Sequence, residues 1–159
     1  MNNLTHKEKT LLEDQKTHEE VCVKKYNAYA SQAQDPQLKQ LFSSLSQKEQ
    51  QHLDTINQIM NGQVPNMNQN QQQGQPGGQS QNTHVQQAND SVSGSGNDAD
   101  LCNDMLMTEK YVSGAYDTAI FEFKDTNIRQ ALNHIQKEEQ EHGESIFKYM
   151  ESKGLYKLQ

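Results

Sequence analysis

The chain has no long hydrophobic run, no block of basic residues and only two cysteines among its 159 residues. No apolar stretch approaches the roughly 20 residues of a membrane-spanning helix, and the first residues lack the apolar segment of a signal peptide. A net charge of −7 without a basic cluster argues against a general nucleic-acid partner. These absences predict a protein that is made and folded in a cytoplasm and has no membrane span.

The low apolar content has a local cause. Hydrophobic residues make up 31% of the chain, below the usual ~45–50%, and residues 62–97 lower the average. This segment is rich in Gln, Asn, Gly and Ser and contains neither Lys nor Arg. It cannot bury enough apolar surface to fold, so we predict a flexible, disordered linker. The composition favours a solvated tether over a segment for self-association.

Four stretches on either side of this linker have apolar residues at helical spacing. Their boundaries are marked by capping or terminating residues: Thr5 with Glu8, Asp35 with Pro36, Gly62, Asp125 and Gly154. We therefore predict two helical hairpins, residues 1–61 and 98–159. Cys22 and Cys102 are too few for a disulfide scaffold, and buried free thiols are the simplest interpretation.

The two hairpins are copies of one another. When the sequence is shifted by 90 residues, so that His52 falls on His142, the coinciding residues are mostly apolar or metal-capable residues on one helical stripe. They include Leu11 and Leu101, Glu19 and Glu109, Tyr26 and Tyr116, Asp35 and Asp125, Glu49 and Glu139, and Ile56 and Ile146. The period is too long for a solenoid repeat, so it indicates a duplicated hairpin.

Two such hairpins can pack as one antiparallel four-helix bundle within a single domain. The linker is long enough for a crossover along that bundle. A flexible chain of about 36 residues spans roughly 33 Å, comparable with the about 39 Å length of a 26-residue helix.

Each hairpin also carries a Glu-x-x-His motif, Glu49 with His52 and Glu139 with His142. Residues three apart share one face of a helix. A further glutamate, Glu19 or Glu109, lies before the turn of each hairpin. Its distance from the turn in residues is about the same as that of the motif after the turn. Six side chains are therefore predicted to meet at one height: Glu19, Glu49, His52, Glu109, Glu139 and His142. Two divalent cations would balance the four buried carboxylates, and mixed oxygen and nitrogen ligands suit iron, manganese or zinc.

Residues around these six are interpreted as structural. Tyr26 and Tyr116 are expected in the core with satisfied hydroxyls, rather than as redox participants. No metal role is assigned to Glu20, Glu138 and Glu141, expected on solvated faces, or to His18 and His134, which have no partner in the repeat.

The six-residue set resembles the di-metal ligands of the ferritin-like superfamily, nearest in symmetry to rubrerythrins and bacterioferritins. More specifically, residues 108–111 (TEKY), 118–123 (TAIFEF) and 130–143 (QALNHIQKEEQEHG) resemble the spore coat protein F family. The likeness covers about residues 98–155, with residues 4–62 as a weaker first half. It implies a ferritin-like antiparallel four-helix bundle. It also implies a coat component of endospore-forming Firmicutes, synthesised in the mother-cell cytoplasm, with other spore coat proteins as partners.

Three functions follow as hypotheses. The first is a structural spore coat protein without turnover, with or without two Fe or Mn ions in its bundle. The second is a di-iron or di-manganese redox enzyme of peroxidase or catalase type. The third is metal storage, which ranks last because nothing suggests a cage. The resemblance supports the fold more strongly than it supports any chemistry.

Overall fold

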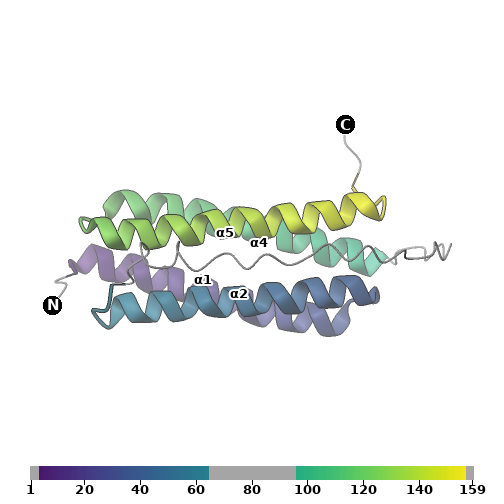
Figure 1. The fold of residues 1–159 in the computed structure, drawn as a ribbon, viewed down its shortest axis with the longest axis horizontal. Helices are drawn as coiled ribbons and strands as arrows, with labels where there is room; N and C mark the ends of the chain where they lie inside the picture. The colour runs from purple at the N-terminus through teal and green to yellow at the C-terminus, as the bar shows by residue number, and fades with distance from the viewer. Residues whose placement is uncertain (1–3, 65–95, 157–159) are drawn as a thin grey trace, which may run out of the picture.

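The computed structural model describes residues 4–64 and 96–156, which form an antiparallel four-helix bundle (Figure 1). The helices are α1 (His6–Gln32), α2 (Pro36–Met60), α4 (Gly96–Glu122) and α5 (Thr126–Ser152). The prediction of an all-α bundle made of two helical hairpins is confirmed. None of the helices described is apolar enough over a sufficient length to cross a membrane.

Three of these helices begin at the capping residue that the sequence predicted. The Thr5 hydroxyl accepts a hydrogen bond from the Glu8 amide, and the Glu8 carboxylate accepts one from the Thr5 amide. Asp35 and Asp125 each accept from backbone N–H groups in the first turn of α2 and α5. These bonds satisfy donors that have no partner inside the helix. The start of α4 differs, because Gly96 and Asn97 are helical although the sequence placed them in the linker.

The ends of α2 and α5 are followed by glycines in the left-handed region. Gly62 has φ 80° and Gly154 has φ 68°. A side chain is strained in this conformation, and glycine adopts it without penalty. Both predicted helix stops are therefore confirmed.

The two hairpins pack so that all neighbouring helices are antiparallel. Tyr26 of α1 contacts Glu109 of α4, and Tyr116 of α4 contacts Glu19 of α1, so these two helices run in opposite directions. Because α1 is antiparallel to both α2 and α4, the last two run the same way, so α2 ends and α4 begins at opposite ends of the bundle (Figure 1). The predicted linker lies between these two helices in the sequence, and its residues 65–95 lie outside the described residues.

The ends of the bundle are held by two equivalent carboxylates, one from each hairpin. Buried Asp98, at the start of α4, accepts hydrogen bonds of 2.8 and 2.9 Å from the backbone N–H groups of Gln34 and Asp35 in the α1–α2 turn. Buried Glu8, at the start of α1, accepts a 3.0 Å bond from the N–H of Lys124 in the α4–α5 turn. Each hairpin thus supplies an acceptor for backbone N–H groups in the turn of the other. We call this pair of contacts the reciprocal clamp.

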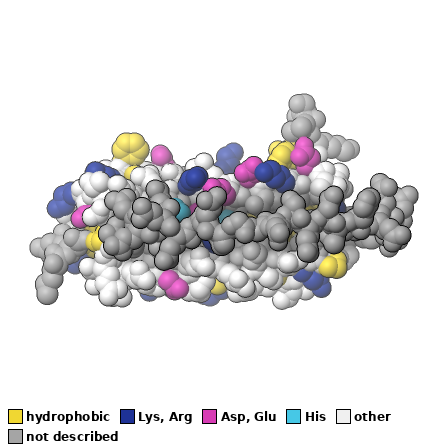
Figure 2. Space-filling view, viewed as in Figure 1, with side chains coloured by type: hydrophobic (Ala, Val, Ile, Leu, Met, Phe, Trp, Pro, Cys, Tyr) yellow, Lys and Arg dark blue, Asp and Glu magenta, His cyan; other side chains and the backbone are white. Residues whose placement is uncertain are grey.

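The core consists of two apolar clusters on either side of a polar layer at mid-bundle. One contains Leu12, Ile56, Ile59, Phe123, Ile128 and Leu132, and the other contains Tyr26, Leu38, Phe42, Met105, Ile146 and Met150. Where the visible face is described, Figure 2 shows charged side chains of both signs and only small, separate hydrophobic patches. The two clusters exclude water from the polar layer between them.

The reciprocal clamp makes Asp98 important for stability. The Asp98→Ala variant loses two hydrogen bonds from backbone N–H groups to a carboxylate, which costs about 1–3 kcal/mol. Urea unfolding followed by circular dichroism is expected to show a lower midpoint for this variant. Asp100→Ala, at an exposed position of the same helix, is the matched control. Equal midpoints for the two variants would contradict a stabilising role for the clamp.

Candidate metal centre

The structure brings all six predicted residues together in the polar layer, and all four helices contribute. The α1 helix supplies Glu19 and α4 supplies Glu109, while α2 and α5 each supply a Glu-x-x-His pair. The side chains are buried, with 0–4% of each residue exposed: Glu19, Glu49, His52, Glu109, Glu139 and His142. The convergence arises because each motif lies on the inner stripe of its helix at the same distance from its turn.

The six side chains form two overlapping groups, each able to offer four ligand atoms within 4.8 Å of one another. One group consists of Glu19, Glu49, His52 and Glu139, and the other consists of Glu49, Glu109, Glu139 and His142. Glu49 and Glu139 belong to both groups. Glu49 and Glu139 would be available to two cations, Glu19 and His52 would hold one of them, and Glu109 and His142 would hold the other.

Both imidazoles direct Nδ1 toward the carboxylates. The Nδ1 atom of His52 is 3.1 Å from Glu49 and 3.2 Å from Glu139. The Nδ1 atom of His142 is 3.0 Å from Glu49 and 3.5 Å from Glu109. The two rings stack with centroids 5.5 Å apart and an interplanar angle of 16°. The ring nitrogens thus face the same carboxylates from adjacent positions.

Two buried tyrosines also contact the centre, and each reaches from one hairpin to the other. Tyr26 donates its hydroxyl hydrogen to Glu109, and Tyr116 donates to Glu19. Burial, and then the charges of the neighbouring carboxylates, raises the pKa of both phenols well above the ordinary value. The hydroxyls therefore remain protonated donors, as expected for core tyrosines with satisfied hydroxyls.

Three carboxylate oxygens at the centre accept no hydrogen bond from any residue that the structure describes. They are the Oε2 atoms of Glu19, Glu109 and Glu139, all buried. A buried carboxylate oxygen without a donor costs several kcal/mol unless a cation approaches it. Oxygen donors of this kind beside imidazole nitrogens fit iron, manganese or zinc. The residues present therefore fit a pair of divalent cations.

Burial is the largest influence on the pKa values of three of these side chains. It raises the pKa of Glu49 to about 7, with neighbouring carboxylates adding to the effect and the two imidazoles opposing it. Burial likewise raises the pKa of Glu139 well above its ordinary value. For His142, burial acts to lower the pKa, but hydrogen bonds to three carboxylates prevail and raise it to about 11. Without cations, the centre therefore retains protons on both kinds of ligand.

One prediction about the surrounding residues is wrong. Glu141 lies on the solvated face, with 55% of its side chain exposed, but Glu138 has only 20% of its side chain exposed. The Oε2 atom of Glu138 is 2.9 Å from Nε2 of His52 across the α2–α5 interface. This hydrogen bond is the main reason why the pKa of Glu138 falls to about 2. The helical stripe gave no sign of this contact, because it depends on how α5 is rotated against α2.

The two histidines that have no partner in the repeat, His18 and His134, have different surroundings. His134 lies 3.5 Å from Glu138 on the same helix. His18 packs edge-on against Tyr111, with ring centroids 5.4 Å apart, between α1 and α4. Neither belongs to the two groups of candidate ligands, so no metal role arises for either.

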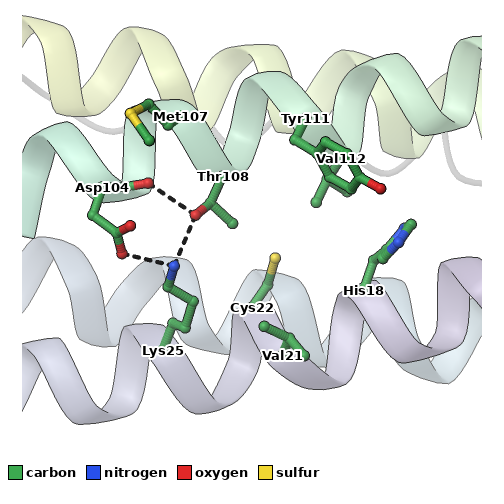
Figure 3. Close-up of a pocket in the computed structure, with 9 residues that line it drawn as sticks. All are labelled: His18, Val21, Cys22, Lys25, Asp104, Met107, Thr108, Tyr111 and Val112. Atoms are coloured by element: carbon green, nitrogen blue, oxygen red, sulfur yellow. Dashed lines mark hydrogen bonds and ion pairs between the residues drawn. The ribbon is translucent and has the colours of Figure 1, made fainter.

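A surface pocket of about 290 Å³ lies between α1 and α4 (Figure 3). Lys25 closes one end of it through an ion pair of 2.7 Å with Asp104 and a 3.0 Å hydrogen bond to Thr108. The Cys22 side chain points from α1 toward α4 in this pocket. Burial, followed by the charges of the central carboxylates, raises the pKa of the Cys22 thiol far above its ordinary value. Cys22 and Cys102 are both buried free thiols.

The second hairpin also matches a known protein family. The sequence model of the Coat F domain matches residues 97–159. The match covers less than half of the chain. It contains α4 and α5, and with them Glu109, Glu139 and His142. The first hairpin lies outside the match, although it repeats the same ligand positions.

A relative in *Bacillus subtilis* (strain 168), the uncharacterized protein YusN, is 35% identical over 63 residues. The alignment covers 40% of this chain and 57% of the relative, so the chain spans little more than half of that protein's length. No solved structure matches the chain.

The protonated ligands predict how cation binding depends on pH. Metal ligands must be deprotonated, so a cation has to displace the protons held at the centre. We expect Mn²⁺ binding to release protons and to tighten as pH rises through the Glu49 pKa of about 7. Calorimetry in two buffers of different ionisation enthalpy measures the proton release, and the same titration at several pH values measures the affinity. An affinity that does not change with pH, without proton release, would contradict this expectation.

Proposed function

We propose that this protein is a structural component of the spore coat whose bundle holds two divalent metal ions, Fe or Mn. The Coat F domain over residues 97–159 supports the coat role. The single observation that carries the metal centre is the convergence of six buried ligand side chains with carboxylate oxygens that lack donors. Other coat proteins are the partners that this role requires.

The metal ions would have a structural task in such a component. Glu49 and Glu139 would bridge the two ions, and each ion would take one further carboxylate and one imidazole. These ligands come from both hairpins, so bound cations would tie the hairpins together. The positive charge would also offset the repulsion among four buried carboxylates. A coat component would gain a stabilised bundle without any turnover.

Metal analysis tests this centre directly. Protein purified without chelators and supplied with Fe or Mn is expected to contain two ions per chain, one for each ligand group. Glu49→Ala and Glu139→Ala each remove a shared ligand and are expected to lose both ions. Glu144→Ala, which changes an exposed residue of α5, is the control and should retain them. A folded wild-type protein that holds no metal after supplementation would refute the centre.

The redox enzyme is the second candidate. An Fe or Mn pair would supply electron exchange with a small oxidant. The observation that favours this candidate is the pocket between α1 and α4. Cys22 lines this pocket, and the charges of the central carboxylates contribute, after burial, to the raised pKa of its thiol. The metal-loaded samples described above decide between the candidates. Metal-dependent removal of hydrogen peroxide that is lost in Glu49→Ala would favour the enzyme, and no removal would favour the structural role.

The outer face of α4 offers a surface for assembly with coat partners. Met107, Tyr111 and Phe121 expose 69%, 68% and 83% of their surface. At ~100° per residue they fall within about one quarter of the helix circumference. Exposed aromatic and methionine side chains gathered on one face are typical of interaction sites. The face belongs to the Coat F domain, which connects it with the proposed role.

Changing this face is expected to weaken assembly without unfolding the bundle. The triple variant Met107→Ser, Tyr111→Ser, Phe121→Ser should be depleted several-fold from the extracted coat fraction of spores in a sporulating *Bacillus subtilis* host. Immunodetection of an epitope-tagged chain measures this. The control is Lys137→Ser, Glu144→Ser, Lys148→Ser, on exposed positions of α5. Equal incorporation of both variants would exclude the α4 face as the assembly surface.

A further inference from the structure

The two ligand groups are equivalent in the repeat, but their surroundings differ at one position. The shift that places His52 on His142 also places Lys48 on Glu138. A base in the first hairpin therefore corresponds to an acid in the second. The two side chains meet in the structure, with Nζ of Lys48 3.8 Å from Oε1 of Glu138. The symmetry of the centre is broken where α2 and α5 pack together.

Glu138 contacts only one of the two imidazoles. Its Oε2 atom is 2.9 Å from Nε2 of His52, on the side of the ring that faces away from the centre. The Nδ1 atom of the same ring points at the shared carboxylates, 3.1 Å from Glu49. A carboxylate at Nε2 keeps the proton on that nitrogen and leaves the Nδ1 lone pair for a metal. Glu138 thus orients His52 as an Nδ1 ligand.

His142 lacks this support. Among the described residues, its Nε2 atom has no hydrogen-bond partner, whereas its Nδ1 atom contacts Glu49 at 3.0 Å. The residue that corresponds to Glu138 is Lys48, and a lysine ammonium has donors but no acceptor. Lys48 therefore cannot accept a proton from an imidazole N–H. No carboxylate at Nε2 therefore fixes the tautomer or the orientation of the His142 ring.

We propose that Glu138 makes the two metal positions unequal, so that the one containing Glu19 and His52 binds a divalent cation first and more tightly than the one containing Glu109 and His142. This proposal rests on the proposed metal centre and specifies its order of loading. Glu138 is a positioning residue, since it acts through His52 and not on the metal. Outer carboxylates of this kind change metal affinity by about 10–100-fold. At limiting metal, the protein would hold a single ion on one known side.

Titration with Co²⁺, followed by its visible absorption and by calorimetry, tests the order. The wild-type protein is expected to bind in two steps whose affinities differ by about 10–100-fold. In Glu138→Gln the first step should weaken until the two steps nearly coincide, while circular dichroism shows the helices intact. Two equal steps in the wild type, or unchanged steps in Glu138→Gln, would overturn the proposal. No Co²⁺ binding by the wild type would instead overturn the metal centre itself.

A charge exchange separates positioning from general stability. The double variant Lys48→Glu, Glu138→Lys keeps the net charge and the ion pair but moves the carboxylate to the side of His142. Each position is monitored alone by removing the unshared glutamate of the other, with Glu109→Ala or Glu19→Ala. In the wild-type background the tighter site should survive in Glu109→Ala. In the exchanged background it should survive in Glu19→Ala, and an unchanged preference would refute the role of Glu138.

Discussion

The burial of four carboxylates and two imidazoles in the middle of the bundle is the constraint on which the rest of the structure depends. Apolar clusters on both sides exclude water, so each charged group needs a partner from the protein or a cation. Tyrosine hydroxyls and imidazoles supply some of these partners. Both tyrosine contacts cross from one hairpin to the other, as do the contacts of His52 with Glu139 and of His142 with Glu49. The same contacts that satisfy the centre therefore also set how the hairpins dock.

The duplication explains why two short hairpins make one stable unit. The reciprocal clamp at the ends and the crossed tyrosine–glutamate contacts in the middle follow the same two-fold relation. Each hairpin supplies what the other lacks. The second hairpin carries half of the ligand set and one apolar face, so it needs another hairpin to bury both. In this chain, the first hairpin provides it.

The two-fold relation is strict at the ligands and relaxed around them. Glu138 and Lys48 occupy corresponding positions with opposite charge, and Cys22 corresponds to Val112. These differences lie in the layer that surrounds the six side chains. At the ligand positions each imidazole lies within 4.0 Å of three carboxylates of the set, so a change there would disturb several contacts at once. The surrounding layer can diverge, and with it the properties of the two sides.

Local information was enough to predict the helices, their caps and the six central residues. Periodicity, capping chemistry and the repeat act within a few turns, and two matched hairpins leave little freedom in the height of Glu19 relative to Glu49. The sequence alone could not show that Glu138 faces His52, that Tyr26 serves the glutamate of the other hairpin, or that Asp98 caps a distant turn. Those contacts depend on the rotation of each helix about its axis and on the docking of two hairpins. Packing decides both, and packing exists only in the folded bundle.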